Sequence, residues 1–179
     1  MLIQIDKLKR RPRQIELDEH ASGFAVLGDL VDHGAIDFKD RIRGTLTASW
    51  AGKIIEVSGL LETTVTSLCR RCLKPVTSHL EIDVLLCYSD LSDEEAAVAE
   101  ELELQRAELG LIAFSGTEID LRPDIEQEII MALPQQLLCA EHCRGLCPSC
   151  GIDLNQGQCR CEQPIFHAGL AALKNFRIK

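Results

Sequence analysis

The fold of the C-terminal part of this chain is decided by Cys139-Ala-Glu-His-Cys143-Arg-Gly-Leu-Cys147-Pro-Ser-Cys150-Gly-Ile-Asp-Leu-Asn-Gln-Gly-Gln-Cys159-Arg-Cys161. A further cysteine pair stands far upstream, in Cys69-Arg-Arg-Cys72. Thiolates two or three residues apart can bind one tetrahedral ion, and zinc is the ion that most often occupies such sites structurally. The sequence therefore predicts that bound metal holds this part of the chain together.

One Cys₄ site is predicted from four cysteines that lie close together in the sequence. Cys147-Pro-Ser-Cys150-Gly151 is typical of a metal-binding knuckle, in which backbone N–H groups point at the first thiolate and the glycine permits a tight turn. Cys159 and Cys161 would complete this site at a small loop-closure cost.

A second Cys₄ site is predicted from the remaining pairs, Cys69 with Cys72 and Cys139 with Cys143. These pairs are far apart in the sequence, so an ion shared between them would strongly restrain the tertiary fold. The expected cofactor is structural Zn²⁺, in one or two sites.

Other ligand sets stay open at this point. Cys69 and Cys72 could share an ion with Cys147 and Cys150, or His142 could replace one cysteine of the 139/143 pair. A redox Cys-x-x-Cys is less favoured, because that motif works at a helix N-terminus, whereas Cys69 follows a predicted strand.

Composition limits the class of protein. Of 179 residues, 46% are hydrophobic but only 4% are aromatic, so the core must be mainly Leu, Ile and Val. No run approaches roughly 18 apolar residues, and the N-terminal apolar run is too short for a signal peptide. We therefore expect a cytoplasmic protein without a membrane partner, in which clustered cysteines bind metal rather than form disulfides.

Alternating apolar residues predict a long β-hairpin with Cys69 and Cys72 at its tip. The two inward-facing rows are Ile55, Val57, Leu61, Val65 and Leu80, Ile82, Val84, Leu86. An earlier strand over Thr45–Trp50 would end in a turn at Ala51 and Gly52. Cys87 has apolar neighbours and is expected to be a buried core cysteine.

Helical patterns follow the hairpin. Asp120 is the expected N-cap of a helix that ends at Pro134 and packs one apolar face against the sheet, formed by Ile125, Ile129, Ile130 and Leu133. A second helix is expected over residues 163–176. The fold class is α+β: an antiparallel sheet that could close into a barrel, two main helices and a Cys-rich zinc module. The predicted domains are residues 1–134, including the hairpin tip, and residues 135–179.

The cysteine pattern and its surroundings resemble the DUF177 family, which includes bacterial YceD and its chloroplast relatives. The resemblance rests on Cys69-Arg-Arg-Cys72-Leu, on the helix end Ile129-Ile-Met-Ala-Leu-Pro134, and on the whole run from Cys139 to Cys161; it covers residues 45 to 176. It implies a role in accumulation of large-subunit (23S) ribosomal RNA, and hence in ribosome assembly.

Two non-enzymatic functions are consistent with these features. The first is binding of ribosomal RNA or a pre-ribosomal particle through Arg70, Arg71, Lys74 and Arg144, which could equally balance thiolate charge. The basic stretch Lys7–Arg13 could also contact phosphates or form a solvated loop. The second is an adapter whose acidic segment, residues 90–108, docks on a basic ribosomal protein. The formal charge of −9 argues against general polyanion binding, so RNA contacts must come from local basic patches.

An enzyme is the disfavoured third possibility. A Cys₄ site is closed, whereas a catalytic zinc needs an open coordination position. The sequence also lacks a P-loop and a Gly-rich dinucleotide fingerprint. We therefore expect no catalytic residues and no small-molecule substrate.

Overall fold

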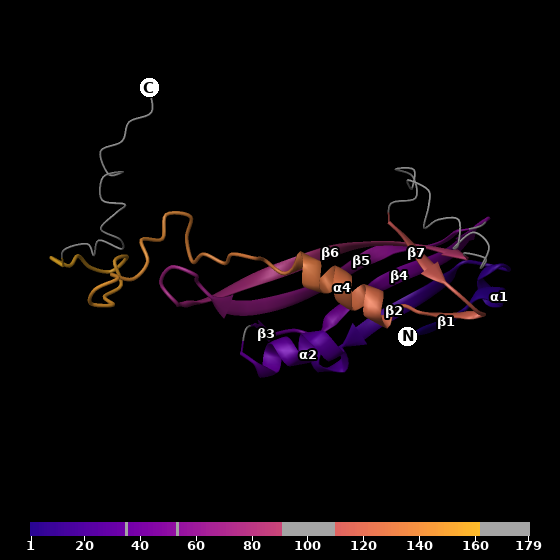
Figure 1. Cartoon of the computed structure of the whole chain (residues 1–179), viewed down its shortest axis with the longest axis horizontal. Coiled ribbons are helices and arrows are strands. Elements are labelled where there is room, and N and C mark those ends of the chain that lie inside the picture. The colour runs from indigo at the N-terminus through magenta and orange to yellow at the C-terminus, as the bar shows by residue number, and fades with distance from the viewer. Residues whose placement is uncertain (35, 53, 91–109, 162–179) are drawn as a thin grey trace, which may run out of the picture. The chain divides into compact units, whose positions relative to one another are not determined.

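The computed structural model describes residues 1–34, 36–52, 54–90 and 110–161 (Figure 1). The chain divides into two compact units, one formed by Met1–Ser67 and Thr77–Gln135, the other by Leu68–Val76 and Gln136–Lys179. The loop that carries Cys69 and Cys72 therefore groups with the C-terminal unit, whereas the sequence pattern assigns it to the N-terminal domain.

The fold is α+β, as predicted. Its elements in chain order are β1 (Leu2–Gln4), α1 (Ile5–Leu8), β2 (Arg13–Glu19), η1 (Ala21–Gly23), α2 (Ala25–Asp32), β3 (Asp37–Phe38), β4 (Ile42–Ala51), β5 (Ile54–Leu68), β6 (Pro75–Asp90), β7 (Leu111–Phe114), β8 (Glu118–Asp120) and α4 (Arg122–Ala132).

The main sheet has the strand order β2-β4-β5-β6-β7, with β3 paired to β5, while β1 and β8 form a separate ribbon. Its pairs are mostly antiparallel, but β6 and β7 are parallel. Closure into a barrel requires the first and last strands to pair. Among the described residues, the edge strands β2 and β7 have no such pairing, so the expected barrel is wrong and the sheet is open.

The predicted hairpin of β5 and β6 is confirmed, with Cys69 and Cys72 in the loop between the two strands. The Thr66 and Thr77 hydroxyls meet at 2.9 Å across it. All four apolar residues of the first inward row, from Ile55 to Val65, are fully buried. Period-two alternation thus specified which face of these strands enters the core.

Cys87 is the exception to the predicted pattern. It lies on the face opposite Leu86 and Tyr88, and it is only half-buried. Successive strand residues point to opposite faces, so apolar sequence neighbours do not bury a residue between them. The prediction of a core cysteine is therefore wrong.

Helix α4 is the expected helix after the hairpin, and it buries Ile125 and Ile129 of the predicted apolar face. Ile130 and Leu133, predicted on the same face, are only half-buried. Its N-cap residue is Leu121, one position later than predicted, although the Asp120 carboxylate still accepts a 3.1 Å hydrogen bond from the Arg122 amide. The second predicted helix, over residues 163–176, lies outside the described residues, as does the acidic segment beyond Asp90.

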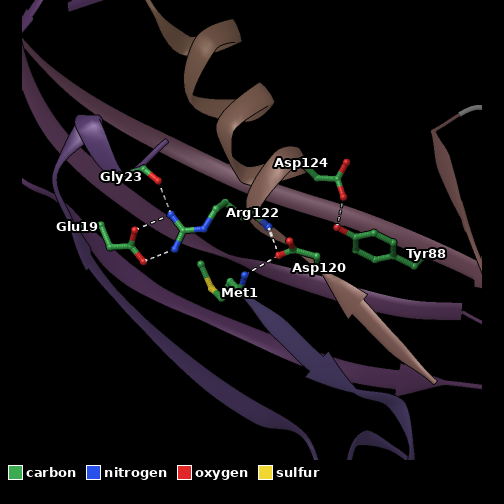
Figure 2. A network of polar contacts seen from close by, with 7 residues as sticks. All are labelled: Met1, Glu19, Gly23, Tyr88, Asp120, Arg122 and Asp124. Atoms are coloured by element: carbon green, nitrogen blue, oxygen red, sulfur yellow. Dashed lines mark hydrogen bonds and ion pairs between the residues drawn. The ribbon is translucent and has the colours of Figure 1, made fainter. Parts of the chain in front are cut away.

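Charged side chains of α4 tie the helix to the segment around η1 (Figure 2). The Arg122 guanidinium donates to both carboxylate oxygens of Glu19, at 2.7 and 2.9 Å, and to the Gly23 carbonyl at 2.7 Å. It also lies 5.1 Å from the centre of the Phe24 ring. This bidentate pair fixes where the chain enters α2.

Glu126 is a buried acid on the same helix. Its Oε1 accepts hydrogen bonds from the backbone amides of Val26 at 2.6 Å and Leu27 at 2.9 Å, in the first turn of α2. The N-cap residue of α2, Phe24, offers no side-chain cap of its own. Glu126 therefore supplies the cap and the negative charge that a helix N-terminus favours, from a position 100 residues away.

Replacement of Glu126 by alanine should leave two amides without their partner at a largely buried helix end. We expect Glu126→Ala to lower the free energy of unfolding by about 3 kcal/mol, measured by denaturant titration of the full chain. Glu128→Ala removes the same charge from the same helix and is expected to change it by less than about 0.5 kcal/mol. Equal losses in both variants would contradict the capping role.

Tyr88 gives a pH-dependent prediction. It is the chain's single tyrosine, it is buried, and its hydroxyl donates to Asp124 at 2.6 Å (Figure 2). Burial and this hydrogen bond raise its pKa well above the ordinary value. The fold holds the neutral phenol, so its contribution to stability is complete below about pH 10 and decreases as the pH rises above that value.

We expect tyrosinate absorbance to be absent at pH 10 to 11 and to develop together with unfolding. In Tyr88→Phe, the corresponding loss of stability above pH 10 should disappear. A reversible tyrosinate titration near pH 10 in the folded protein would show that the contact with Asp124 is not maintained.

Candidate metal centres

The C-terminal unit contains a first group of four thiols, from Cys69, Cys72, Cys139 and Cys143. Their sulfur atoms lie within 4.8 Å of one another, with 3.8 Å between Cys69 and Cys143 and 3.4 Å between Cys72 and Cys139. Four thiolates bound to one ion at about 2.3 Å would be spaced by about 3.8 Å. Three of the four residues are buried. The separations therefore fit a tetrahedral metal site.

A second group consists of Cys147, Cys150, Cys159 and Cys161, whose sulfur atoms also lie within 4.8 Å of one another. Only Cys147 is buried here, so this group is the more exposed of the two. The structure thus brings the eight cysteines into the two sets that their spacing favours. His142 belongs to neither set.

The turn at the first Cys-x-x-Cys pair closes with two backbone hydrogen bonds. The Cys69 amide donates to the Lys74 carbonyl at 2.7 Å, and the Leu73 amide donates to the Cys69 carbonyl at 2.9 Å. Leu73 has φ of 58°, a left-handed conformation that costs a non-glycine residue about 1–2 kcal/mol. The turn therefore takes a strained residue where a knuckle normally has glycine.

The second pair repeats this turn. The Cys147 amide donates to the Ile152 carbonyl at 2.9 Å, and the Gly151 amide donates to the Cys147 carbonyl at 2.9 Å. Gly151, with φ of 73°, occupies the position equivalent to Leu73 and adopts the conformation without strain. The two halves of the Cys-rich unit are thus built on one local geometry, with the same Cys-x-x-Cys spacing and different residues between and after the cysteines.

In each turn, backbone N–H groups lower the pKa of one cysteine and so favour its thiolate form. Burial acts to raise the pKa of Cys69, but backbone N–H groups, first that of Cys139, lower it to about 6. The amides of Cys150 and Ser149 lower the pKa of Cys147 to about 6. N–H groups directed at sulfur stabilise the anion that a metal binds.

Polar residues after the second knuckle reach back to the first cluster. Asn155 donates from Nδ2 to the Cys143 sulfur at 3.3 Å, and its Oδ1 accepts the Arg144 amide at 2.7 Å. Asp153 accepts from both the backbone and the side chain of Asn155, and it forms a 2.6 Å ion pair with Lys74. These hydrogen bonds and this ion pair form a brace that connects the two clusters within the unit.

The backbone adds to this brace. The Leu146 amide donates to the Arg71 carbonyl at 3.0 Å, and the Leu154 amide donates to the Gly145 carbonyl at 2.9 Å. A Cβ at position 145 would lie 2.8 Å from the Arg71 carbonyl oxygen, so only glycine allows this approach.

The four basic residues predicted to meet RNA separate into two kinds. Arg71 donates to the Cys143 carbonyl at 2.8 Å, and Lys74 is held by Asp153. These two side chains have structural partners inside the unit, so they are less available to an external phosphate.

Arg70 and Arg144 are different. Both are exposed, and neither side chain forms a hydrogen bond or ion pair within the described part of the chain. Arg70 lies between two cysteines of the first group, and Arg144 directly follows a third. Arg160, which the sequence also places inside the second cysteine group, is exposed as well.

Comparison with known proteins adds the family. Residues 57–177 match the sequence model of the family described as large ribosomal RNA subunit accumulation protein YceD. The chain belongs to the YceD family. This match covers all eight clustered cysteines and confirms the resemblance seen in the sequence. The family's description connects it with accumulation of the large ribosomal RNA subunit.

Relatives of the chain have descriptions that add no activity. Uncharacterized proteins of Mycobacterium bovis and of two strains of Mycobacterium tuberculosis are each 29% identical over 164 residues, which is 86% of this chain and 70% of their own length. No solved structure matches the chain significantly.

Among the described residues, no helix has the length and hydropathy needed to cross a bilayer.

The role of Asn155 can be tested through metal affinity. Loss of an outer hydrogen bond to a ligating atom commonly weakens metal binding by about 10- to 100-fold. We expect Asn155→Ala to show this loss for one of two ions, in a titration of the apo protein with Co²⁺ followed by thiolate-to-metal absorption. Gln156→Ala is the neighbouring control and should titrate like wild type. Unchanged binding in Asn155→Ala would contradict the brace.

Proposed function

We propose that this YceD-family protein supports accumulation of 23S ribosomal RNA as a cytoplasmic, non-enzymatic factor that binds this RNA or a pre-ribosomal particle containing it. Its Cys-rich unit would make the contact, with one structural Zn²⁺ in each Cys₄ cluster. The observation that carries the proposal is the pair of exposed guanidinium groups at Arg70 and Arg144, which have no partner among the described residues and each lie next to a cysteine of the first cluster.

Zinc is the metal that this donor set fits best. Four thiolates with the observed separations match its preferred tetrahedral ligand set. Such a site is closed to substrate, so the ion would supply structure, not reactivity. The residues that would hold it are the two sets of four cysteines. Four of these eight cysteines are not buried, which fits a small unit that has little apolar core of its own.

The position of the two arginines favours phosphate recognition. A guanidinium presents two parallel N–H donors that match phosphate oxygens, and fixing its backbone lowers the entropy lost on binding. The Arg70 amide is held by the Leu137 carbonyl at 3.0 Å, and the Arg144 amide by Asn155 at 2.7 Å. The backbone of each arginine is therefore restrained, while its guanidinium group stays exposed.

The deciding experiment is ultraviolet crosslinking in cells with sequencing of the RNA attached to the tagged protein. We expect a sharp peak on large-subunit ribosomal RNA. The double variant Arg70→Gln/Arg144→Gln should weaken binding to RNA from that peak about tenfold and lower the salt dependence, because two phosphate contacts are lost.

Arg41→Gln/Arg43→Gln is the matched control. It removes two positive charges from the other unit, where both arginines pair with Asp18. Metal content should equal that of wild type in both variants. Background RNA only, with ribosomal proteins recovered in the same pulldown, would overturn direct RNA binding. That result would instead support the adapter function through the acidic segment, most of which lies outside the described residues.

A further inference from the structure

A basic hollow of about 670 Å³ lies in the N-terminal unit, outside the Cys-rich unit discussed above. Its lining among the described residues is Lys7, Arg10, Arg11, Pro12 and Arg13, from the end of α1 to the start of β2. Hollows of this size commonly enclose a small ligand or part of a larger one. Four of the five lining side chains are cationic.

Local packing presents these side chains to solvent. Ile5 and Leu8 are both buried, so the single turn of α1 is anchored by its apolar positions. The turn closes with hydrogen bonds from the Lys9 amide to the Ile5 carbonyl at 3.1 Å and from the Arg10 amide to the Lys7 carbonyl at 3.3 Å. With the apolar residues inside, Lys7 and Arg10 are exposed at the surface.

The charge of this segment differs from that of the whole chain. Residues 6–13 contain five cations and one acid, a local charge of +4 in a chain of −9. The acid, Asp6, lies 3.9 Å from Lys9, whose ammonium also lies 5.1 Å from the centre of the Trp50 ring. Within the described residues, none of the four cations lining the hollow forms an ion pair.

Other basic residues described in the same unit have carboxylate partners. Lys39 pairs with Asp37, and Arg41 and Arg43 both pair with Asp18. The concentration of unpaired cations in one hollow is therefore a local feature of the fold. An unneutralised cluster of guanidinium groups produces a local positive potential that attracts polyanions despite a negative net charge.

We propose that this hollow binds the phosphodiester backbone of RNA, as a contact site additional to Arg70 and Arg144. The proposal rests on the proposed function, which makes RNA the partner. Three arginines within four residues offer forked donors to successive phosphates, a geometry that ammonium groups do not provide. An anionic membrane is a poorer fit, because α1 buries its apolar side chains and has none to insert.

A pair of charge-matched variants tests the site. Arg10→Gln/Arg11→Gln/Arg13→Gln and Lys39→Gln/Arg41→Gln/Arg43→Gln each remove three positive charges, moving the formal charge from −9 to −12. The probe is a single-stranded oligouridylate of about 20 nucleotides, titrated against the full chain at several salt concentrations. Circular dichroism and metal content establish that both variants fold like wild type.

We expect the hollow variant to lose about 10- to 100-fold in affinity and the salt slope to fall by about 2, since each single-strand phosphate contact contributes about 0.7. The control variant should lose less than about threefold in affinity, because its charges would act on the RNA only through the long-range electrostatic field. Equal losses in the two variants, or no loss in the hollow variant, would overturn the site.

Mapping of crosslinked peptides separates this proposal from the function on which it rests. Cleavage after glutamate gives residues 1–16 as one fragment, 63–81 with Arg70 as another, and 142–162 with Arg144 as a third. RNA adducts on 1–16, lost in the hollow variant, support the site. Adducts confined to the other two fragments overturn it and leave the proposed function standing. If none of the three fragments carries an RNA adduct and an acidic protein is captured instead, both the RNA site in the hollow and the proposed function are overturned.

Discussion

The first cysteine cluster imposes the strongest constraint on this chain, because it joins sulfur atoms that are far apart in the sequence. Cys72 and Cys139 are 67 residues apart, yet their sulfur atoms lie at 3.4 Å. The chain between them contains β6, β7, β8 and α4. An ion bound by these thiolates would restrict the unfolded chain as well as the folded unit, since closing a long loop in advance removes conformational freedom. The second cluster, made within 15 residues, has a local effect only.

Helix α4 plays the corresponding part in the N-terminal unit, and it does so with charged groups. Arg122 clamps Glu19, Asp124 accepts from Tyr88, and Glu126 caps α2. The apolar side chains of the helix could be buried against any neighbouring apolar surface. Each of these polar groups, in contrast, is satisfied by one specific partner. Buried polar groups are costly when unpaired, so they specify the position of the helix more narrowly than apolar contacts do.

The sequence predicted those features that depend on residues close together in the chain. The hairpin follows from period two, and the four cysteine pairs follow from their short spacing, whereas the sequence left open which pairs come together. Helix α2 was not predicted, because its cap comes from Glu126 and not from a residue beside it. The structural partners of Arg71 and Lys74 were missed for the same reason, since each lies about 70 residues or more away. Asp153 and Asn155 could have been suspected, as they follow a knuckle glycine in a polar turn.

The negative charge of the chain is compatible with RNA binding if the basic sites are fixed in place. An arginine in an acidic chain can pair with a neighbouring carboxylate, as Arg41 and Arg43 do with Asp18. Arg70 has no carboxylate partner among the described residues, and its backbone lies in a turn closed by the Cys69 and Leu73 hydrogen bonds. Ordering the backbone of one residue costs about 1–2 kcal/mol, so a turn held by metal-bound thiolates would meet this cost before any RNA bound. The metal ligands and the RNA contacts would thus act together. The ion would contribute to RNA binding indirectly, because it would keep rigid the turn that carries the arginine.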